Sequence, residues 1–136
     1  MSSLTFDELE IKRALLATWS EKTQPAFFKE VPSYNQCAQT AIVIRDCFGG
    51  EILKTEVKLT YLDKTGQNES IIHFYNRIDG KRYDFTDDQF KLNHFLKPIQ
   101  YQDIVVPKEI ASATLQPSQL SAIATGFRAN YKPVSL

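Results

Sequence analysis

The chain has 136 residues, of which 43% are hydrophobic, and its 16 Lys and Arg residues balance its 16 Asp and Glu residues. This size and composition predict one soluble domain, residues 1–136, that buries a continuous core without disulfides or a structural metal. The sequence has no basic run suited to nucleic acid and no apolar stretch long enough to cross a membrane, so neither partner is expected. The N-terminus lacks the features of a signal peptide, which favours a cytoplasmic location.

The first helix is predicted from a capping signal. Thr5-Phe6-Asp7-Glu8 fits a capping box, in which the Thr5 hydroxyl and the Glu8 carboxylate bond the free amides of the first turn. We expect a helix that runs to about Trp19. Its expected apolar side consists of Leu9, Ala14, Leu15, Leu16 and Trp19.

The second helix is expected to begin at a cysteine. Pro32 and the polar residues after it predict a loop that leads to Cys37, and Gly49-Gly50 can adopt the positive φ that ends a helix. A thiol in the first turn faces free backbone N–H groups and the positive end of the helix dipole, which favour thiolate. Alternatively, the cysteine is a small buried hydrophobe.

The two cysteines, Cys37 and Cys47, would lie on this one helix. Their separation corresponds to about 15 Å of helical rise, which is too far for a disulfide. No pair of Cys or His residues has the short spacing of a structural zinc site. We therefore expect free thiols, with Cys47 in the core, and neither a metal nor another cofactor.

The middle of the chain predicts antiparallel strands. Residues 51–61 alternate apolar and polar side chains, with Leu53, Val57, Leu59 and Tyr61 expected on one face. Residues 62–69 predict an exposed reversal into a strand over 70–78, and Asp79-Gly80 predicts a tight hairpin that returns over 81–86. A short helical turn is expected from Asp87 and a stop at 96–98.

The C-terminal part gives weaker signals. Residues 104–107 look extended and are expected to cover an edge of the core. A final helix is expected over 117–131. Its apolar residues at helical spacing are Leu120, Ile123, Phe127 and Tyr131.

The hairpin register brings an imidazole near a carboxylate. With Asp79 and Gly80 at the turn, Tyr75 lies opposite Asp84, and His73 becomes a diagonal neighbour of Asp84 on the same face. The other face is expected to be the buried one and collects Ile72, Phe74, Ile78, Tyr83 and Phe85. The His73 face is predicted to be the polar one.

A helix whose N-terminus crossed the His73 face would complete a catalytic triad. Cys37 would be the nucleophile, His73 the general base and Asp84 the group that orients the imidazole. Backbone N–H groups at the helix start, with Gln36 or Asn35 as a second donor, are candidates for stabilising an oxyanion.

Tyr75, on the same face, is a further candidate for substrate contact. The alternative to the catalytic triad is a surface hairpin in which His73 and Asp84 merely share a hydrogen bond. His94 lies outside the hairpin and is expected to be peripheral to the site.

The motifs resemble those of the YunG-like family of small bacterial proteins. The matching segments are Ala14–Ser20 with Thr23, Gln36–Ala41, Asp46–Glu51, His73–Arg77, Asp79-Gly80, and Asp84–Thr86 with Gln89-Phe90. The resemblance implies an α+β fold similar to the papain and transglutaminase group, in which a cysteine begins a helix packed, with an N-terminal helix, on an antiparallel sheet of three or more strands. Three features depart from the family pattern: Ile71-Ile72 before the histidine, the long 62–69 connection, and Asn35 where glycine is usual.

The leading functional hypothesis is a cysteine-dependent acyl-transfer enzyme. It would act on a peptide, amide or thioester through a thioester on Cys37, as a hydrolase, deamidase or transglutaminase-like enzyme. The alternative is a non-catalytic binding module that holds a peptide or small ligand in the same cleft.

Overall fold

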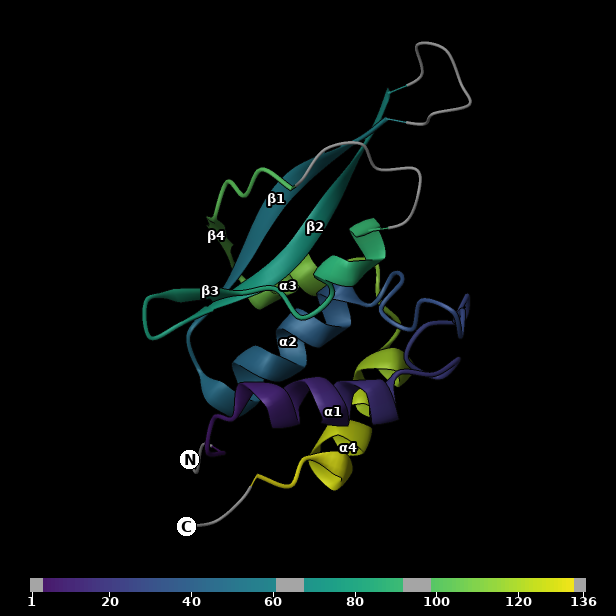
Figure 1. Ribbon diagram of the computed structural model, residues 1–136, viewed down its shortest axis with the longest axis vertical. Coiled ribbons are helices and arrows are strands. Elements are labelled where there is room, and N and C mark those ends of the chain that lie inside the picture. The colour runs from purple at the N-terminus through teal and green to yellow at the C-terminus, as the bar shows by residue number, and fades with distance from the viewer. Residues whose placement is uncertain (1–3, 61–67, 92–98, 134–136) are drawn as a thin grey trace.

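The computed structural model describes residues 4–60, 68–91 and 99–133, which form an α+β domain (Figure 1). Four helices, one short 3-10 helix and four strands are found in these ranges. In chain order they are α1 (Glu8–Thr18), α2 (Cys37–Phe48), β1 (Glu51–Thr60), β2 (Asn68–Ile78), β3 (Lys81–Tyr83), η1 (Asp87–Lys91), β4 (Ile104–Val106), α3 (Lys108–Ser112) and α4 (Pro117–Asn130). The predicted α+β class is confirmed. The predicted reversal at 62–69 falls mostly, and the stop at 96–98 and His94 wholly, outside the described residues.

The strands form an antiparallel sheet in the order β3-β2-β1-β4. Ile78 pairs with Lys81, so Asp79 and Gly80 are the two central residues of the β2–β3 turn, as predicted. Both have positive φ, 50° and 78°, which is the conformation of a type I′ turn. This turn fixes the register of the hairpin and thereby places His73 and Asp84 on one face.

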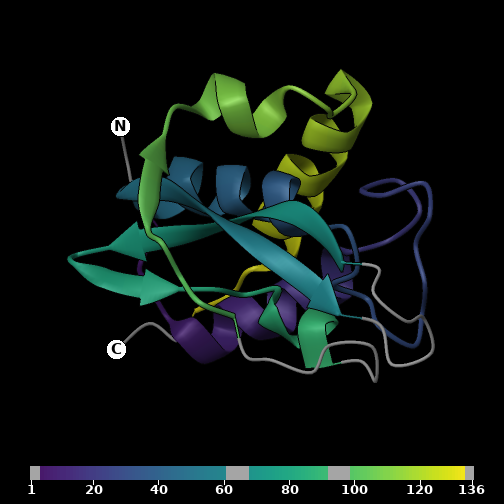
Figure 2. The ribbon, with the colours of Figure 1, turned by 90° about the horizontal axis from the view of Figure 1, so that it is seen from above.

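α2 packs along one face of the sheet (Figures 1 and 2). Ala41 and Ile42 of the helix share a buried cluster with Ile52 of β1, and Asn76 of β2 donates a hydrogen bond to the Ala41 carbonyl (2.9 Å). The helix ends at Gly49, and β1 follows at once. Gly50 has φ +79°, and a Cβ there would lie 2.1 Å from the Arg77 carbonyl oxygen, so only glycine fits this junction.

α1 differs from its prediction in cap and apolar face. Its N-cap is Asp7, whose carboxylate accepts the Glu10 N–H (3.1 Å), so the predicted Thr5 capping box is wrong. Leu9 and Leu16 are exposed, whereas Ile11 is fully buried. The helix packs mainly against α4. The position of α4 decides which residues of α1 are buried, and a helical pattern in the sequence does not show where that neighbour lies.

α4 confirms the predicted final helix, with Ile123, Phe127 and Tyr131 buried. α4 runs so close to α1 that a Cβ on Gly126 would lie 2.8 Å from the Thr18 methyl carbon. The two helices and the second half of α2 enclose the larger core cluster, which contains Cys47. Burial raises the pKa of the Cys47 thiol.

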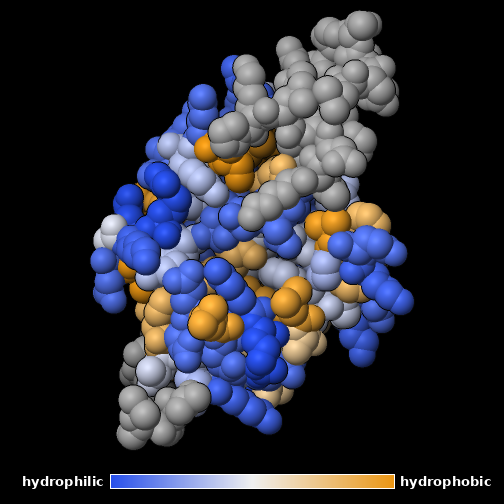
Figure 3. All heavy atoms as spheres, viewed as in Figure 1, coloured by the Kyte–Doolittle hydropathy of each residue, from blue (hydrophilic) through white to orange (hydrophobic). Residues whose placement is uncertain are grey.

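The surface is mixed in polarity. On the face shown in Figure 3, exposed apolar side chains lie in small separate patches among polar ones. Within the described ranges, no helix is long and apolar enough to cross a membrane.

Candidate active site

Cys37 is the first residue of α2 and is partly buried. The loop before it is attached to η1 and its neighbours by side chains: Ser33 Oγ donates to Asp88 Oδ1 (2.6 Å), and the Asn35 N–H donates to Gln89 Oε1 (3.3 Å). Asn35 has φ 57°, a left-handed conformation that asparagine tolerates better than most residues. This explains how asparagine can occupy a position where glycine was expected.

The start of α2 has no side-chain cap. The N–H groups of a first helical turn have no partner within the helix, and the aligned peptide dipoles place partial positive charge there. The Cys37 sulfur therefore lies at the positive end of a helix of 12 residues.

His73 and Asp84 form a short, buried pair. His73 Nε2 lies 2.7 Å from Asp84 Oδ2, and the two side chains are 0% and 5% exposed. The other carboxylate oxygen, Oδ1, accepts the Thr86 N–H (3.2 Å) and its hydroxyl (3.5 Å). Asp84 is thus held from both sides, and one of its oxygens points at the imidazole.

The surroundings of His73 favour its protonated form. Burial alone lowers the pKa of an imidazole, but the hydrogen bond to Asp84 and the nearby Cys37 thiol outweigh it and raise the pKa of His73 to about 9. The ring stacks on Tyr75 (5.8 Å between centroids) and meets the edge of Phe90 (4.7 Å). At neutral pH the ring is an imidazolium with a donor on each nitrogen.

The second ring nitrogen of His73 differs from the first in having no hydrogen-bond partner among the described residues. This nitrogen, Nδ1, is buried. Cys37 interacts with the ring electrostatically, although its sulfur does not meet the geometry of a hydrogen bond to Nδ1. The structure therefore gathers Cys37, His73 and Asp84 at one place, with Asp84 on Nε2 and the thiol near the ring.

The predicted route by which the helix meets the histidine is wrong. The body of α2 packs on the Phe74 and Asn76 face of β2, not on the His73 face. The His73 face is covered instead by η1 and residues 99–103, so His73 and Tyr75 are buried as well. Ile72, predicted to be buried, is 47% exposed. Apolar content alone could not tell which face each covering segment takes.

Gln36 and Gln39 form a buried amide pair beside the thiol. Gln39 Nε2 donates to the carbonyls of Thr23 (2.8 Å) and Asn35 (3.1 Å), which can only accept. The same nitrogen lies 3.1 Å from Gln36 Oε1, which must therefore accept. This orientation leaves Gln36 Nε2, a donor, buried without a partner in the described part of the chain.

The other two predicted site residues are placed differently. Asn35 is exposed, and its backbone N–H and carbonyl are both bonded to glutamine side chains. Tyr75 is 1% exposed, and its hydroxyl donates to Asp103 Oδ1 (2.8 Å). Tyr75 therefore supports His73 by stacking, and a substrate could reach it only if its cover moved.

A pocket of about 510 Å³ lies beside Cys37. Ile72 and Phe74, the residues on either side of His73, form part of its wall together with Leu115. None of its described lining residues is Asp, Glu, Lys, Arg or His. Its amide side chains come from Gln24, Asn35, Gln39, Gln116 and Gln119.

Comparison with known proteins supports the family suggested by the motifs. The model of the YunG protein family matches residues 7–132. The chain is also 34% identical, over 125 residues, to the uncharacterized protein YunG of Bacillus subtilis (strain 168), covering 92% of this chain and 95% of that protein. The chain belongs to the YunG family. No solved structure matches it significantly, so the likeness to papain and transglutaminases stays a prediction.

In this member of the YunG family, one residue of the site escaped prediction. The Tyr101 hydroxyl donates to Asp84 Oδ2 (2.7 Å), the oxygen that also contacts His73. Tyr101 lies in an irregular segment with neither strand alternation nor helical spacing, so no sequence signal links it to the hairpin. Among the described residues of this YunG-family chain, no cluster of three or more His, Cys, Asp or Glu could hold a metal.

Proposed function

We propose that this YunG-family protein is a cysteine-dependent acyl-transfer enzyme of the papain and transglutaminase type. Cys37 is the nucleophile, His73 the general acid and base, and Asp84 the orienting group. One observation carries the proposal: His73 is buried, has Nε2 on Asp84 and Nδ1 unpaired, and interacts with a thiol at a helix start. A histidine that served only packing would be expected to have both ring nitrogens satisfied.

In the first half-reaction the Cys37 thiolate attacks the carbonyl carbon of an amide or thioester. A C–S bond forms, and the carbonyl oxygen becomes an oxyanion. When the carbonyl reforms, the bond to the leaving group breaks, and the His73 imidazolium gives its proton to the departing nitrogen or sulfur. The product is a thioester on Cys37.

In the second half-reaction water or an amine attacks the thioester. Neutral His73 takes the proton of the attacking group, the C–S bond breaks, and Cys37 leaves as thiolate beside the restored imidazolium. Hydrolysis, deamidation and transamidation share these steps and differ only in the acyl donor and acceptor. Asp84 keeps Nε2 oriented in both half-reactions.

Two groups could stabilise the oxyanion. The Cys37 backbone N–H belongs to the uncapped first turn of α2. Gln36 Nε2 is a buried donor whose orientation is fixed by Gln39. A free buried donor costs stability, so its presence on the residue that directly precedes Cys37 supports a role in binding developing negative charge.

The pocket beside Cys37 would hold the acyl part of the substrate. Its wall combines amides with the apolar side chains of Ile72, Phe74 and Leu115 and has no charged residue among those described. Transfer of a charged group into such a site is unfavourable without a partner. The proposed substrate is therefore an uncharged amide, peptide or thioester with an apolar portion.

The second candidate function is a binding module without catalysis. The same pocket favours it, because a volume of about 510 Å³ suits a small ligand whether or not the thiol reacts.

Alkylation of Cys37 by iodoacetamide separates the two functions. In a Cys47→Ala background, Cys37 should react at pH 6 at least about tenfold faster than glutathione, since a thiolate is the reacting form. His73→Ala should slow the reaction by about tenfold, and Lys81→Ala, at the far end of the hairpin, should not. Circular dichroism controls for folding. Labelling no faster than glutathione, or insensitive to His73→Ala, would exclude the enzyme and leave the binding module.

A further inference from the structure

Asp84 Oδ2 accepts two hydrogen bonds, each from a different residue. His73 Nε2 and the Tyr101 hydroxyl each lie 2.7 Å from it, whereas Oδ1 is held separately by Thr86. Two donors on one oxygen divide its negative charge. A group that binds Oδ2 therefore competes with the imidazole for that charge.

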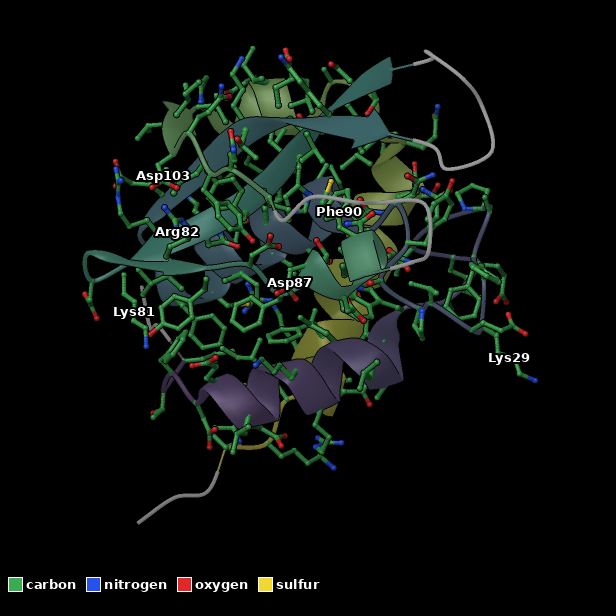
Figure 4. The ribbon with its side chains drawn as sticks, turned by 45° about the horizontal axis from the view of Figure 1, so that its top comes forward. Lys29, Lys81, Arg82, Asp87, Phe90 and Asp103 are labelled. Atoms are coloured by element: carbon green, nitrogen blue, oxygen red, sulfur yellow. The ribbon has the colours of Figure 1, made fainter. Side chains whose placement is uncertain are left out.

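The Tyr101 ring is fixed in place. It meets the Tyr75 ring edge-on with centroids 4.8 Å apart, and the Arg82 guanidinium lies 4.4 Å from its centre. Arg82 in turn donates two hydrogen bonds to Asp103, two residues further along (Figure 4). The contacts with Tyr75 and Arg82 thus hold the ring so that its hydroxyl stays at Oδ2.

The backbone on either side of Tyr101 is anchored as well. The Thr55 hydroxyl donates to the Gln100 carbonyl (2.9 Å) and accepts the Gln102 N–H (3.0 Å), and the Asp103 N–H donates to the Tyr75 hydroxyl (2.8 Å). These hydrogen bonds tie residues 99–103 to Thr55 of β1 and to Tyr75 of β2, so the segment covers the His73 face of the sheet in a fixed position.

We propose that Tyr101 is a positioning residue that sets the proton affinity of His73 through the shared oxygen of Asp84. This role in the reaction rests on the proposed function, but the effect on the imidazole does not. The titratable or charged groups around His73 are Asp84, Cys37 and Tyr75, with Tyr101, Arg82, Asp103 and Asp87 beyond them. Tyr101 is the donor among these that bonds the same oxygen as the ring.

Removal of the hydroxyl has a defined direction. In Tyr101→Phe the aromatic ring is kept and Thr86 still bonds Oδ1. His73 is then the remaining one of the two donors that bond Oδ2 in the wild type, so the carboxylate interacts more strongly with the imidazolium. The imidazolium becomes more favourable, so the pKa of His73 rises by about 0.5 to 1, a three- to tenfold gain in proton affinity. Neutral His73, which the second half-reaction needs, becomes scarcer, and the rise of kcat with pH moves upward by the same amount.

Tyr131→Phe is the matched control. It also removes a hydrogen-bonded tyrosine hydroxyl, but the partners of that hydroxyl are the Thr5 carbonyl and the Asp7 N–H, not Asp84. The pKa of His73 should change by less than about 0.2 in Tyr131→Phe. The measurement is the NMR titration of the His73 ring protons in wild type, Tyr101→Phe and Tyr131→Phe. Equal changes in both variants, or a lower pKa of His73 in Tyr101→Phe, would overturn the proposal.

A second measurement covers the case in which Tyr101→Phe does not fold. In the wild type, the Tyr101 hydroxyl proton should exchange slowly enough with water to be seen by NMR, and its signal should be lost in Asp84→Ala, which removes the acceptor. An unprotected hydroxyl would overturn the proposal. If Cys37 proves unreactive while the His73 pKa follows Tyr101, the proposed enzyme fails and the coupling stands.

Discussion

The two ends of α2 carry the same residue in opposite surroundings. Cys37, in the first turn, is partly exposed, borders a pocket and lies near a protonated imidazole. Cys47, near the last turn, is 2% exposed in a core cluster built from α1, α2 and α4, and burial raises the pKa of its thiol. One helix thus separates a thiol suited to chemistry from a thiol suited to packing.

The difference arises from what each end meets. The first turn has uncapped amides and faces β2 beside His73, whereas the last turn is enclosed by apolar side chains. Sulfur is polarisable enough to serve both purposes, so its role follows from the local charges and from access to solvent.

The largest expected effect is on activity, and it separates the two cysteines. Cys37→Ala should lower acyl transfer by at least about 1,000-fold, because the nucleophile is lost, with little change in stability. Cys47→Ala should lower the free energy of unfolding by about 1–2 kcal/mol through lost core contacts and leave turnover intact. Screening of uncharged amides and thioesters, together with urea denaturation, measures both. Loss of turnover in Cys47→Ala, with the fold intact, would break the comparison.

The next effect is on the pH dependence of stability, and it should be confined to the Cys37 end. Folding raises the pKa of His73 from 6.5 to about 9, so the folded state holds this proton more tightly. The resulting stabilisation is complete below pH 6.5 and is lost as the pH rises through 9. Its magnitude is about 3 kcal/mol.

Asp84→Asn tests this pH dependence, because it removes the carboxylate that favours the imidazolium. The difference in free energy of unfolding between wild type and Asp84→Asn should be largest at pH 6 and shrink towards pH 10. Cys47 titrates in both proteins, so its contribution cancels in the difference. A difference that is constant with pH would show that His73 does not carry the raised pKa.

The smallest effect concerns the surface at the Cys47 end. Asp46 forms exposed ion pairs with Lys108 (2.9 Å) and Arg45 (3.4 Å). Exposed pairs contribute little, so Asp46→Asn should change the free energy of unfolding by about 0.5 kcal/mol or less. A loss as large as that of Cys47→Ala would mean that surface charge, not packing, secures this end of the helix.

The fold was largely predictable where signals are local. The Asp79-Gly80 turn fixed the hairpin register, and Gly49-Gly50 marked the end of α2 and the start of β1. Neighbours were not predictable. Leu9 and Leu16 fit an apolar helix face but are exposed, because α1 turns another side, with Ile11 and Leu15, towards α4 and the larger core cluster.

The candidate site also has one part that local sequence signals predict and another part that they do not. The closeness of His73 and Asp84 follows from period-two alternation in one hairpin, and the position of Cys37 at a helix start follows from the loop before it. Tyr101, which comes from one of the two segments that cover the His73 face, lies 17 residues beyond Asp84 in the chain, and its hydroxyl bonds the carboxylate through one atom. A contact of this kind produces no periodic pattern in the sequence.

The sequence by itself determined most of the elements, though not α3, together with the hairpin register, the three residues of the proposed triad and the family. Tertiary structure decided which face of the sheet α2 covers, the burial of His73 and Tyr75, the orientation of Gln36 and the sharing of Asp84 Oδ2 by Tyr101. The reason is physical. Local pattern is set by backbone geometry, whereas the protonation of a buried imidazole depends on charges and donors that distant segments bring within hydrogen-bond distance.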